Sequence, residues 1–421
     1  MAMVINVYID TKINKKNKFD HPTDLDNFEN ENTFAKTLAS INNLKQTNDK
    51  LSLYIFAVAA GEDRSHDQEI KKKMNKILRE SSHQYYLFTN SDVKQLNNYT
   101  DSRFFSVNGY PEIRNLGLII PSLLNQDIII QIDDDELLRE DYLITLKKIL
   151  KDNPDKYLFT APYEKNGTTE INNEDPLKSW RKFYSMQKDM NKLMKDKSLK
   201  ETLFGFGGNM IIRNELAEKS LYPSAVPRGE DFSYLLASRL IYENGNPEAE
   251  IEKKNEIYKA YFSPLKELTI IHEPPAEAES DFLFYLEKNL KRFIMEWSIF
   301  NKQDNLSVSE LKKLSYYLAE MFGYDDFKSK LLDIIEEVKV NYDSKTAENF
   351  EKEILSFYDQ CSKINRFELY KKDQSDYIDF LDNWKDNNEF RELLLSFKIN
   401  RNYNKKEYIF IIMLAIYYKP F

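Results

Sequence analysis

Cysteine is nearly absent from this chain of 421 residues, since Cys361 is the only one. A single thiol excludes internal disulfides and any zinc site built from several cysteines. Long apolar runs are missing as well: the longest, residues 408–418, has 11 residues, about half of the roughly 20 that span a bilayer. The first residues show no apolar run behind a basic segment, so no signal peptide is expected. We expect a cytoplasmic protein without a transmembrane segment, and peripheral contact with a membrane stays open.

Charge of one sign is only in modest excess, with 60 Lys and Arg against 69 Asp and Glu and a net charge of -9. An acidic chain without a long basic block is not typical of proteins that bind DNA or RNA, so we expect no nucleic-acid partner. The hydrophobic share of 42% and the aromatic share of 14% supply enough apolar material for a packed interior. The length predicts more than one structural unit.

Glycine and proline are scarce and unevenly placed. Nine of the ten glycines lie between residues 61 and 245, whereas 276–419 holds no proline and a single glycine. Apolar residues recur at helical spacing in that second stretch, which predicts an all-helical C-terminal region. We therefore expect three units: an N-terminal extension over residues 1–50 that adds one strand to the core (residues 4–9), a catalytic domain over 51–275, and the helical region 276–421.

Residues 51–150 alternate between buried strands and amphipathic helices. Strands are predicted at 51–59, 84–89, 104–107 and 127–132, and helices at 70–78, 111–120 and 140–150. This alternation predicts an α/β fold with a mostly parallel sheet and helices on both faces. Ligands bind such sheets at the carboxyl ends of the strands. The acidic run Asp133-Asp134-Asp135-Glu136 directly follows the strand at 127–132 and so falls at that edge.

Two interpretations of this acidic run stay open from the residues alone. Carboxylate oxygens are the ligands that Mg²⁺ and Mn²⁺ prefer, and such ions usually bridge to the phosphates of a substrate. The alternative is a solvated turn before the next helix.

Four motifs in a fixed order add a resemblance. Residues 109–117 (GYPEIRNLG) and the acidic run resemble the Arg-Asn-x-Gly helix and the DxD motif of GT-A glycosyltransferases, glycosyltransferase family 2 in particular. Residues 205–213 (GFGGNMIIR) resemble that family's glycine-rich acceptor-side loop, and 228–232 (RGEDF) its Glu-Asp motif. Ile271-His272-Glu273 resembles the late histidine that completes the metal site of several GT-A families. The resemblance covers 51–275 and departs at the first strand predicted there, which ends in Val58-Ala59-Ala60-Gly61 instead of Pro-x-Tyr-Asn.

The resemblance implies a GT-A, Rossmann-like domain and a metal-dependent, hexosyltransferase-like glycosyltransferase with Mn²⁺ or Mg²⁺ as cofactor. It implies transfer, with inversion, from a UDP- or GDP-sugar to a carbohydrate, glycoconjugate or lipid-linked acceptor, as in bacterial polysaccharide or glycoconjugate synthesis. A retaining GT-A enzyme and a non-catalytic nucleotide-sugar-binding module remain alternatives. No glycine-rich phosphate loop ending in lysine follows the first predicted strand, which argues against a nucleotidyltransferase.

The resemblance also implies a role for individual residues. The metal ligands are Asp135, Asp133 and His272; the general base is Asp231, with Glu230 orienting it or the acceptor; the nucleotide-sugar contacts are Ala59, Gly61, Glu62, Arg114, Asp133, Asp134, Gly207 and Gly208. Asp134 and Glu136 are expected to be solvated. For three residues a structural role competes with the functional one: His272 as a packing histidine, Asp231 as a helix N-terminal acid, and Arg114 as half of a surface ion pair. The helical region should not carry the chemistry; it would shape the acceptor site or mediate self-association, and 408–418 would either seal a core or lie on a membrane.

Overall fold

The structure is a computed structural model. It describes residues 1–12, 19, 22–45, 47–171, 174–224, 226, 229–239, 257–274, 281–300, 308–321 and 327–399. The predictions for residues 408–418 and for Arg228 therefore lie outside the described residues.

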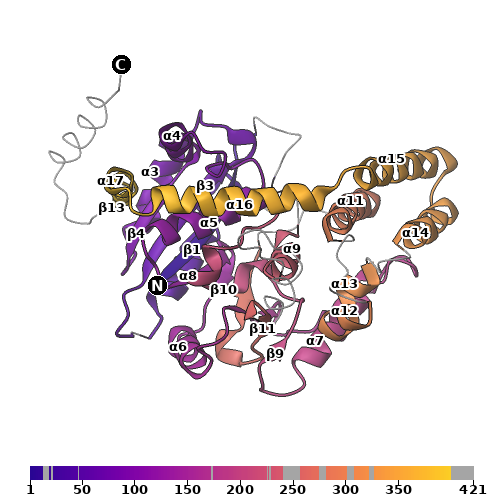
Figure 1. Cartoon of the computed structure of the whole chain (residues 1–421), viewed down its shortest axis with the longest axis horizontal. Helices are drawn as coiled ribbons and strands as arrows, with labels where there is room; N and C mark the ends of the chain where they lie inside the picture. Colours follow the sequence, from indigo (N-terminus) through magenta and orange to yellow (C-terminus); the bar gives the residue numbers. More distant parts are fainter. Residues whose placement is uncertain are drawn as a thin grey trace.

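A large mixed sheet forms the centre of the molecule (Figure 1). Its strands lie in the order β13-β4-β3-β1-β5-β10-β7-β11-β9, with β2 beside β1. The bounds are β1 Ala2–Asp10, β2 Thr23–Asp24, β3 Ser52–Ala59, β4 Gln84–Phe88, β5 Ile128–Asp133, β7 Leu158–Thr160, β9 Lys200–Glu201, β10 Met210–Arg213, β11 Ala260–Phe262 and β13 Lys398–Ile399. The four strands from β4 to β5 run parallel. A second sheet has the order β6-β12-β8, from Glu136–Leu137, Ile270–His272 and Tyr163–Glu164. The α/β class with a mostly parallel sheet is confirmed.

The N-terminal segment supplies the middle of the sheet. Strand β1 lies between β3 and β5 and pairs with β3 from Ala2↔Ser52 to Ile9↔Ala59. Its run AMVINVYI is buried throughout, as expected of a strand with helices on both faces. The predicted boundary at residue 51 thus falls between two strands that pair with each other, and the sheet begins at residue 2.

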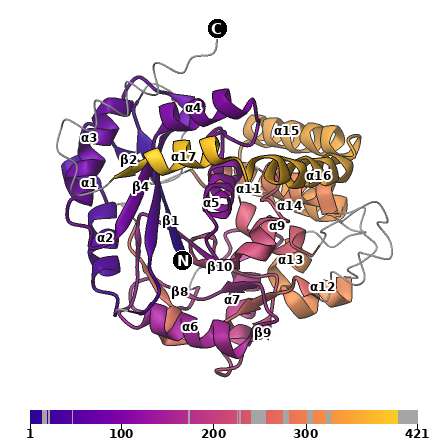
Figure 2. The ribbon, with the colours of Figure 1, turned by 60° about the vertical axis from the view of Figure 1, so that its left-hand side comes forward.

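Helices cover both faces of the sheet (Figure 2). The first part of the chain contributes α1 Phe28–Glu31, α2 Phe34–Asn42, α3 Asp67–Leu78, α4 Asn90–Thr100, α5 Tyr110–Leu123, α6 Tyr142–Asp152, α7 Lys182–Leu193, α8 Asn214–Ala217 and α9 Glu230–Ala237. Successive residues of β1 belong to two different cores, Val4 to one and Ile5 to the other. This alternation follows from the period of two of a strand and shows that each face carries its own apolar layer.

One predicted strand is wrong. Residues 104–107 form a loop, and its aromatic side chains pack against the C-terminal region: Phe104 lies 5.7 Å from Tyr377 and Phe105 lies 5.7 Å from Phe380, ring centre to ring centre. An apolar run of four residues indicates that the segment is buried, but it does not indicate which element the segment packs against. Here that element is helix α16 (Arg366–Trp384) of the C-terminal region.

The C-terminal region is helical, as predicted, apart from the short strand β13. Its helices are α11 Phe282–Phe300, α12 Val308–Leu314, α13 Tyr316–Met321, α14 Phe327–Asn341, α15 Ser344–Ser362, α16 Arg366–Trp384 and α17 Asn388–Ser396. Within the described ranges, no helix is long and apolar enough to cross a membrane.

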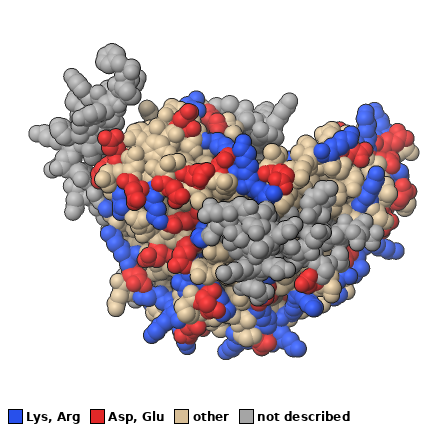
Figure 3. All heavy atoms as spheres, viewed as in Figure 1, with Lys and Arg blue, Asp and Glu red and all other residues tan. Residues whose placement is uncertain are grey.

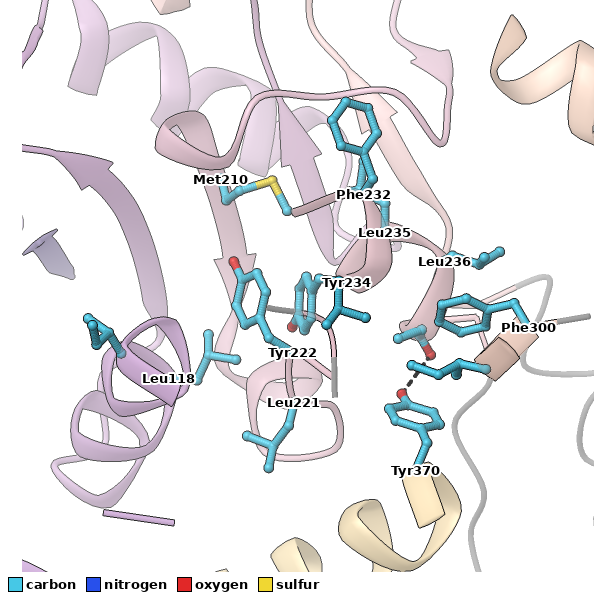
Figure 4. Close-up of a cluster of buried hydrophobic side chains, with 14 of the residues drawn as sticks. Leu118, Met210, Leu221, Tyr222, Phe232, Tyr234, Leu235, Leu236, Phe300 and Tyr370 are labelled. Atoms are coloured by element: carbon cyan, nitrogen blue, oxygen red, sulfur yellow. Dashed lines mark hydrogen bonds between the residues drawn. The ribbon is translucent and has the colours of Figure 1, made fainter. Parts of the chain in front are cut away.

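Helix α16 attaches this region to the sheet domain. It extends from α15 along the domain towards α17 (Figure 1), and β13 then pairs with β4 at the edge of the sheet. The hydroxyl of Tyr377 donates to the carbonyl of Ala217 at 2.8 Å, and that of Tyr370 to Ala237 at 3.3 Å. Figure 4 shows Tyr370 beside Leu236 and Phe300 in the shared core.

Candidate active site

One cavity of about 270 Å³ brings most of the predicted site residues together at the carboxyl ends of β1 and β5. It is lined by Tyr8, Tyr110, Arg114, Asp133, Asp134, Asp135, Tyr163, Phe206, Gly207, Gly208, Gly229, Glu230, Asp231, Phe232, His272 and Arg292. These residues come from eight separate parts of the chain, and the fold alone makes them neighbours. Five carboxylates and two guanidinium groups give the cavity an excess of negative charge.

Asp133 and Glu230 are connected by one buried arginine. Arg114 projects from α5, and its Nη2 donates to Asp133 Oδ2 at 2.7 Å while its Nε donates to Glu230 Oε1 at 3.4 Å. Arg114 is 3% exposed, so it is not half of a surface ion pair. Its Nη1 and Asp133 Oδ1 have no protein partner among the described residues, which leaves a donor and an acceptor at the cavity wall. Burial and the neighbouring Asp135 raise the pKa of Asp133, and Arg114 opposes this.

Asp134 and Glu136 are buried, so the expectation that both are solvated is wrong. The carboxylate of Asp134 accepts from Thr33 Oγ1 at 3.0 Å, and its carbonyl accepts from Thr37 Oγ1 at 2.7 Å. Glu136 accepts from the N–H of Asp133 at 2.8 Å and from the hydroxyl of Tyr163. Burial raises the pKa of both carboxyl groups well above their usual range. These hydrogen bonds hold the acidic turn in shape.

His272 reaches the acidic turn through the small sheet. Strand β12 pairs with β6 so that His272 lies opposite Glu136, and its Nε2 lies 3.1 Å from Asp135 Oδ2. The imidazole stacks on the ring of Tyr163, with 5.3 Å between centres, and this fixes its plane. Asp135 and His272 therefore place a carboxylate oxygen and an imidazole nitrogen side by side at the cavity.

The donor set fits a divalent ion that also binds a substrate. Throughout the part of the chain that the structure describes, no three His, Cys, Asp or Glu side chains form a group that could hold a metal ion. Ions such as Mg²⁺ are commonly held by only one or two carboxylates and complete their shell with water and substrate phosphates. Two neighbouring ligands of an octahedral ion at about 2.1 Å lie about 3.0 Å apart, close to the spacing of Asp135 and His272. Of the predicted ligands, Asp133 faces Arg114 instead of this pair.

The Glu-Asp turn enters the cavity at the start of α9. Gly229 precedes the helix with φ 74°, a backbone conformation that favours glycine. Glu230 is buried and bonded to Arg114, and burial together with Asp231 raises its pKa while Arg114 lowers it. Asp231 lines the cavity beside Gly207: a Cβ at Gly207 would lie 3.1 Å from Cβ of Asp231.

The predicted nucleotide contacts fall into two groups. Gly207 and Gly208 begin a short 3₁₀ helix, η2 (Gly207–Asn209), at the cavity wall. Ala59, Gly61 and Glu62 do not line this cavity; they lie at the end of β3 and in the 3₁₀ helix η1 (Ala60–Glu62). Since β1 precedes β3 in the chain, the strand at 51–59 is not the first strand of the sheet.

Several residues at the cavity were not predicted from the sequence: Tyr8, Tyr110, Tyr163, Phe206, Phe232 and Arg292. Tyr110, Phe206 and Phe232 lie within the motifs at 109–117, 205–213 and 228–232 but were given no role there, and Tyr8 and Tyr163 carry no local signal that separates them from core residues. Arg292 does carry one, because it lies four residues before Glu296 on the apolar stripe of α11, and charged residues there are rarely buried unless paired.

Comparison with known proteins gives a likeness in fold. No protein-family model and no curated sequence matches the chain. Among solved structures, the chain is similar to the mannosyltransferase PcManGT from Pyrobaculum calidifontis in complex with GDP-Man and Mn²⁺, at 12% identity and a TM-score of 0.43, over 90% of this chain and 86% of that one. It is also similar to residues 1–349 of TarS from S. aureus, at 12% identity and a TM-score of 0.41, over 86% and 90% of the two chains.

Proposed function

We propose that the protein is a metal-dependent glycosyltransferase that moves a sugar from a nucleoside-diphosphate sugar to an acceptor hydroxyl, with inversion. One observation carries the proposal: the acidic turn, His272, the Gly207–Asn209 loop and the Glu-Asp turn line the same cavity, although they are spread over about 140 residues of sequence. Sugar transfer needs a site for a cation, a space where the donor can approach the backbone of glycine residues closely, and a carboxylate that can act as a base.

The negative excess of the cavity supports the use of a cation. A diphosphate would be repelled by five carboxylates, and the two arginines offset only part of that charge. Asp135 and His272 would hold Mn²⁺ or Mg²⁺, and the ion would stabilise the charge that develops on the leaving diphosphate. Arg114, fixed by Asp133 and Glu230, presents its free Nη1 as a further donor to the nucleotide sugar.

Asp231 is proposed as the general base. No side-chain or backbone group is shown donating to its carboxylate within the described part of the chain, in contrast to Glu230, which Arg114 engages. A base must be able to accept the proton of the attacking hydroxyl, and an engaged carboxylate is less able to do so. Asp231 would take that proton as the hydroxyl attacks the anomeric carbon on the face opposite the diphosphate.

The test combines donor binding with turnover. A thermal-shift panel of UDP-, GDP-, CMP- and dTDP-sugars with and without Mn²⁺ identifies the donor, and release of nucleoside diphosphate then measures transfer to water or to an added acceptor. Asp231→Asn should bind the donor as wild type does and react about 100- to 10,000-fold more slowly. Asp281→Asn, which precedes α11 outside the cavity, is the matched control and should react at the wild-type rate.

Two results would refute parts of the proposal. Wild-type turnover by Asp231→Asn would remove the base and favour the retaining alternative, which the anomeric configuration of the product, read by NMR, decides directly. Donor binding without turnover for any tested acceptor, water included, would favour a non-catalytic binding module.

A further inference from the structure

A buried arginine from the C-terminal helical region lies in the candidate active site. Arg292 of α11 is 4% exposed, and it lines the same cavity as Asp133, Asp231 and His272. The rings of Phe232, Phe293 and Tyr317 surround its guanidinium, with centres 5.2, 4.9 and 5.9 Å from Cζ. The region that was expected to carry no chemistry thus places a fixed positive charge beside the Glu-Asp turn.

Arg292 is held against the backbone of that turn. Its Nη2 lies 3.5 Å from the carbonyl oxygen of Gly229, to which it donates, and a side chain at Gly229 would collide with the guanidinium. Gly229 is therefore required twice, by its positive φ and by the close approach of Arg292. Gly229 immediately precedes Glu230 and Asp231. The guanidinium that contacts Gly229 therefore helps to fix the backbone from which these two side chains project.

Glu296 completes the connection between α11 and α9. Its Oε1 accepts from Arg292 Nη2 at 3.3 Å and from Ser233 Oγ of α9 at 2.8 Å. Glu296 is 1% exposed, and burial raises its pKa to about 7. One carboxylate oxygen thus bridges the two helices at Ser233, two residues after Asp231.

Such a buried network contributes little to the stability of the fold. Removing two charges from water costs several kcal/mol per ion, and well-packed apolar residues of similar size often do as well or better. Here the hydrogen bonds of Arg292 are long, at 3.3 to 3.5 Å, so the pair recovers little of that cost. Stability therefore gives a weak reason for an ion pair at this place, whereas the geometry of the adjacent turn gives a direct one.

We propose that Arg292, oriented by Glu296, is a positioning residue that aims the carboxylate of Asp231 at the acceptor hydroxyl. The inference rests on the proposed function. Arg292 acts through the backbone of Gly229 and through its charge, which attracts the Asp231 carboxylate towards a single orientation. The C-terminal helical region is then required for turnover as well as for folding.

The experiment measures kcat, acceptor KM and donor affinity for Arg292→Lys in the full chain. Lysine keeps the charge but lacks the planar fork that reaches both Gly229 and Glu296. We expect kcat to fall about 10- to 100-fold, the cost of a small misplacement of a reacting group. Donor affinity should stay within about threefold, because donor contacts lie on the Asp133 and Asp135 side. Glu296→Gln, which keeps the shape of the side chain, should also lower kcat, but by a smaller factor than Arg292→Lys.

The matched control is Arg239→Lys. Arg239 is also 4% exposed, lies just beyond the other end of α9 and pairs with Glu201, away from the cavity. If Arg292 were merely structural, both variants would lower the melting temperature and leave kcat per folded molecule unchanged. A loss of kcat in Arg292→Lys but not in Arg239→Lys supports the positioning role.

A double variant separates this inference from the proposed function. If Arg292 acts through Asp231, then Arg292→Lys in the Asp231→Asn background should slow turnover by less than twofold, since the group being positioned has lost its basicity. Full additivity of the two effects would overturn the inference. Wild-type turnover by Asp231→Asn would instead overturn the proposed base, and a slow Asp231→Asn beside an unimpaired Arg292→Lys would overturn the positioning role alone.

Discussion

Glycine at position 208 and the buried carboxylate of Glu136 depend on each other. A Cβ at Gly208 would occupy the space of that carboxylate, which accepts from the N–H of Asp133 and from Tyr163. The N–H of Gly208 in turn donates to the hydroxyl of Tyr163 at 3.0 Å. The acidic turn is thus shaped by a residue with no side chain.

Gly208→Ala should therefore displace Glu136 and disturb the acidic turn. We expect a loss of about 1–3 kcal/mol in the free energy of unfolding, as for other overpacked sites, together with loss of Mn²⁺-dependent nucleotide binding. Urea unfolding and calorimetric titration measure the two effects. Gly167→Ala is the control, because φ is +78° there and nothing lies within 4 Å of the added carbon. Gly167→Ala should lose stability through backbone strain alone and should bind the nucleotide as wild type does. Equal nucleotide binding by Gly208→Ala and Gly167→Ala would contradict the prediction.

His272 offers a sharper test of the cation site. Alanine at this position removes the imidazole nitrogen that faces Asp135. The apparent affinity for Mn²⁺ in the presence of the nucleotide should fall by at least the roughly 10- to 100-fold that loss of an outer-shell partner costs. His272→Gln, which keeps a polar group beside Asp135 but is a poor ligand, should behave alike. If calorimetric Mn²⁺ affinity is unchanged while the melting temperature falls, the histidine is a packing residue that stacks on Tyr163.

At the scale of single elements, Asp189 joins the α7 insert to the C-terminal region. Its carboxylate accepts from Ser315 Oγ at 2.9 Å and from the backbone N–H groups of Tyr316 and Tyr317 at 2.8 and 2.9 Å. It therefore serves as an N-terminal cap for α13, although it comes from a helix more than 120 residues earlier. Asp189→Ala should lower the free energy of unfolding by about 1–3 kcal/mol, since it leaves buried donors without acceptors. Asp333→Ala, exposed on α14, is the control and should be neutral within about 0.5 kcal/mol.

The same carboxyl group predicts a pH dependence of stability. Burial raises the pKa of Asp189 from 3.8 to about 6 in the folded protein, although its hydrogen bonds oppose this. Between these two values the folded state binds the proton more tightly than the unfolded state, so stability falls as the pH rises from about 4 to about 6 and is level above. A pKa difference of about two corresponds to about 3 kcal/mol. Asp189→Asn should reduce the slope of stability against pH in urea unfolding between pH 4 and 6, and an unchanged slope would contradict the assignment.

Local sequence patterns predicted which helices and strands form, but they did not predict which elements lie next to one another in the fold. The acidic run and Gly207-Gly208 stand out in the sequence because charge clusters and glycines have local causes. Strand pairing has none, so the strand at residues 4–9 was expected as one strand added to a core that begins at residue 51, whereas β1 lies in the middle of the sheet. The spacing of Arg292 and Glu296 on an apolar stripe is visible in the sequence and indicates a buried pair, but only the fold shows that this turn of α11 borders the site.

At the scale of the whole molecule, the sheet domain and the C-terminal helices share one apolar core. Buried residues of β1, α5, α9, α11 and α16 belong to the same cluster, which Figure 4 shows at Leu118, Leu235, Phe300 and Tyr370. Positive and negative side chains are interspersed over the visible surface in Figure 3, so charge does not divide that face into two parts. Arg292 adds a functional connection to this packing.

A shared core predicts one cooperative unfolding transition. Strand β13 pairs with β4 at the sheet edge, and Tyr377 donates to the carbonyl of Ala217, so melting of the C-terminal region removes contacts from β4 and from α8. Scanning calorimetry of the full chain should give one peak whose van't Hoff and calorimetric enthalpies agree. Tyr377→Phe, which loses one buried hydrogen bond, should lower the free energy of unfolding by about 1 kcal/mol and so move that single peak to a lower temperature. It should also lower hydrogen-exchange protection in β5 and α8 as well as in α16. Two peaks, or a loss of protection confined to α16, would show that the helical region folds as a separate unit, and Arg292 would then reach the site from an independent domain.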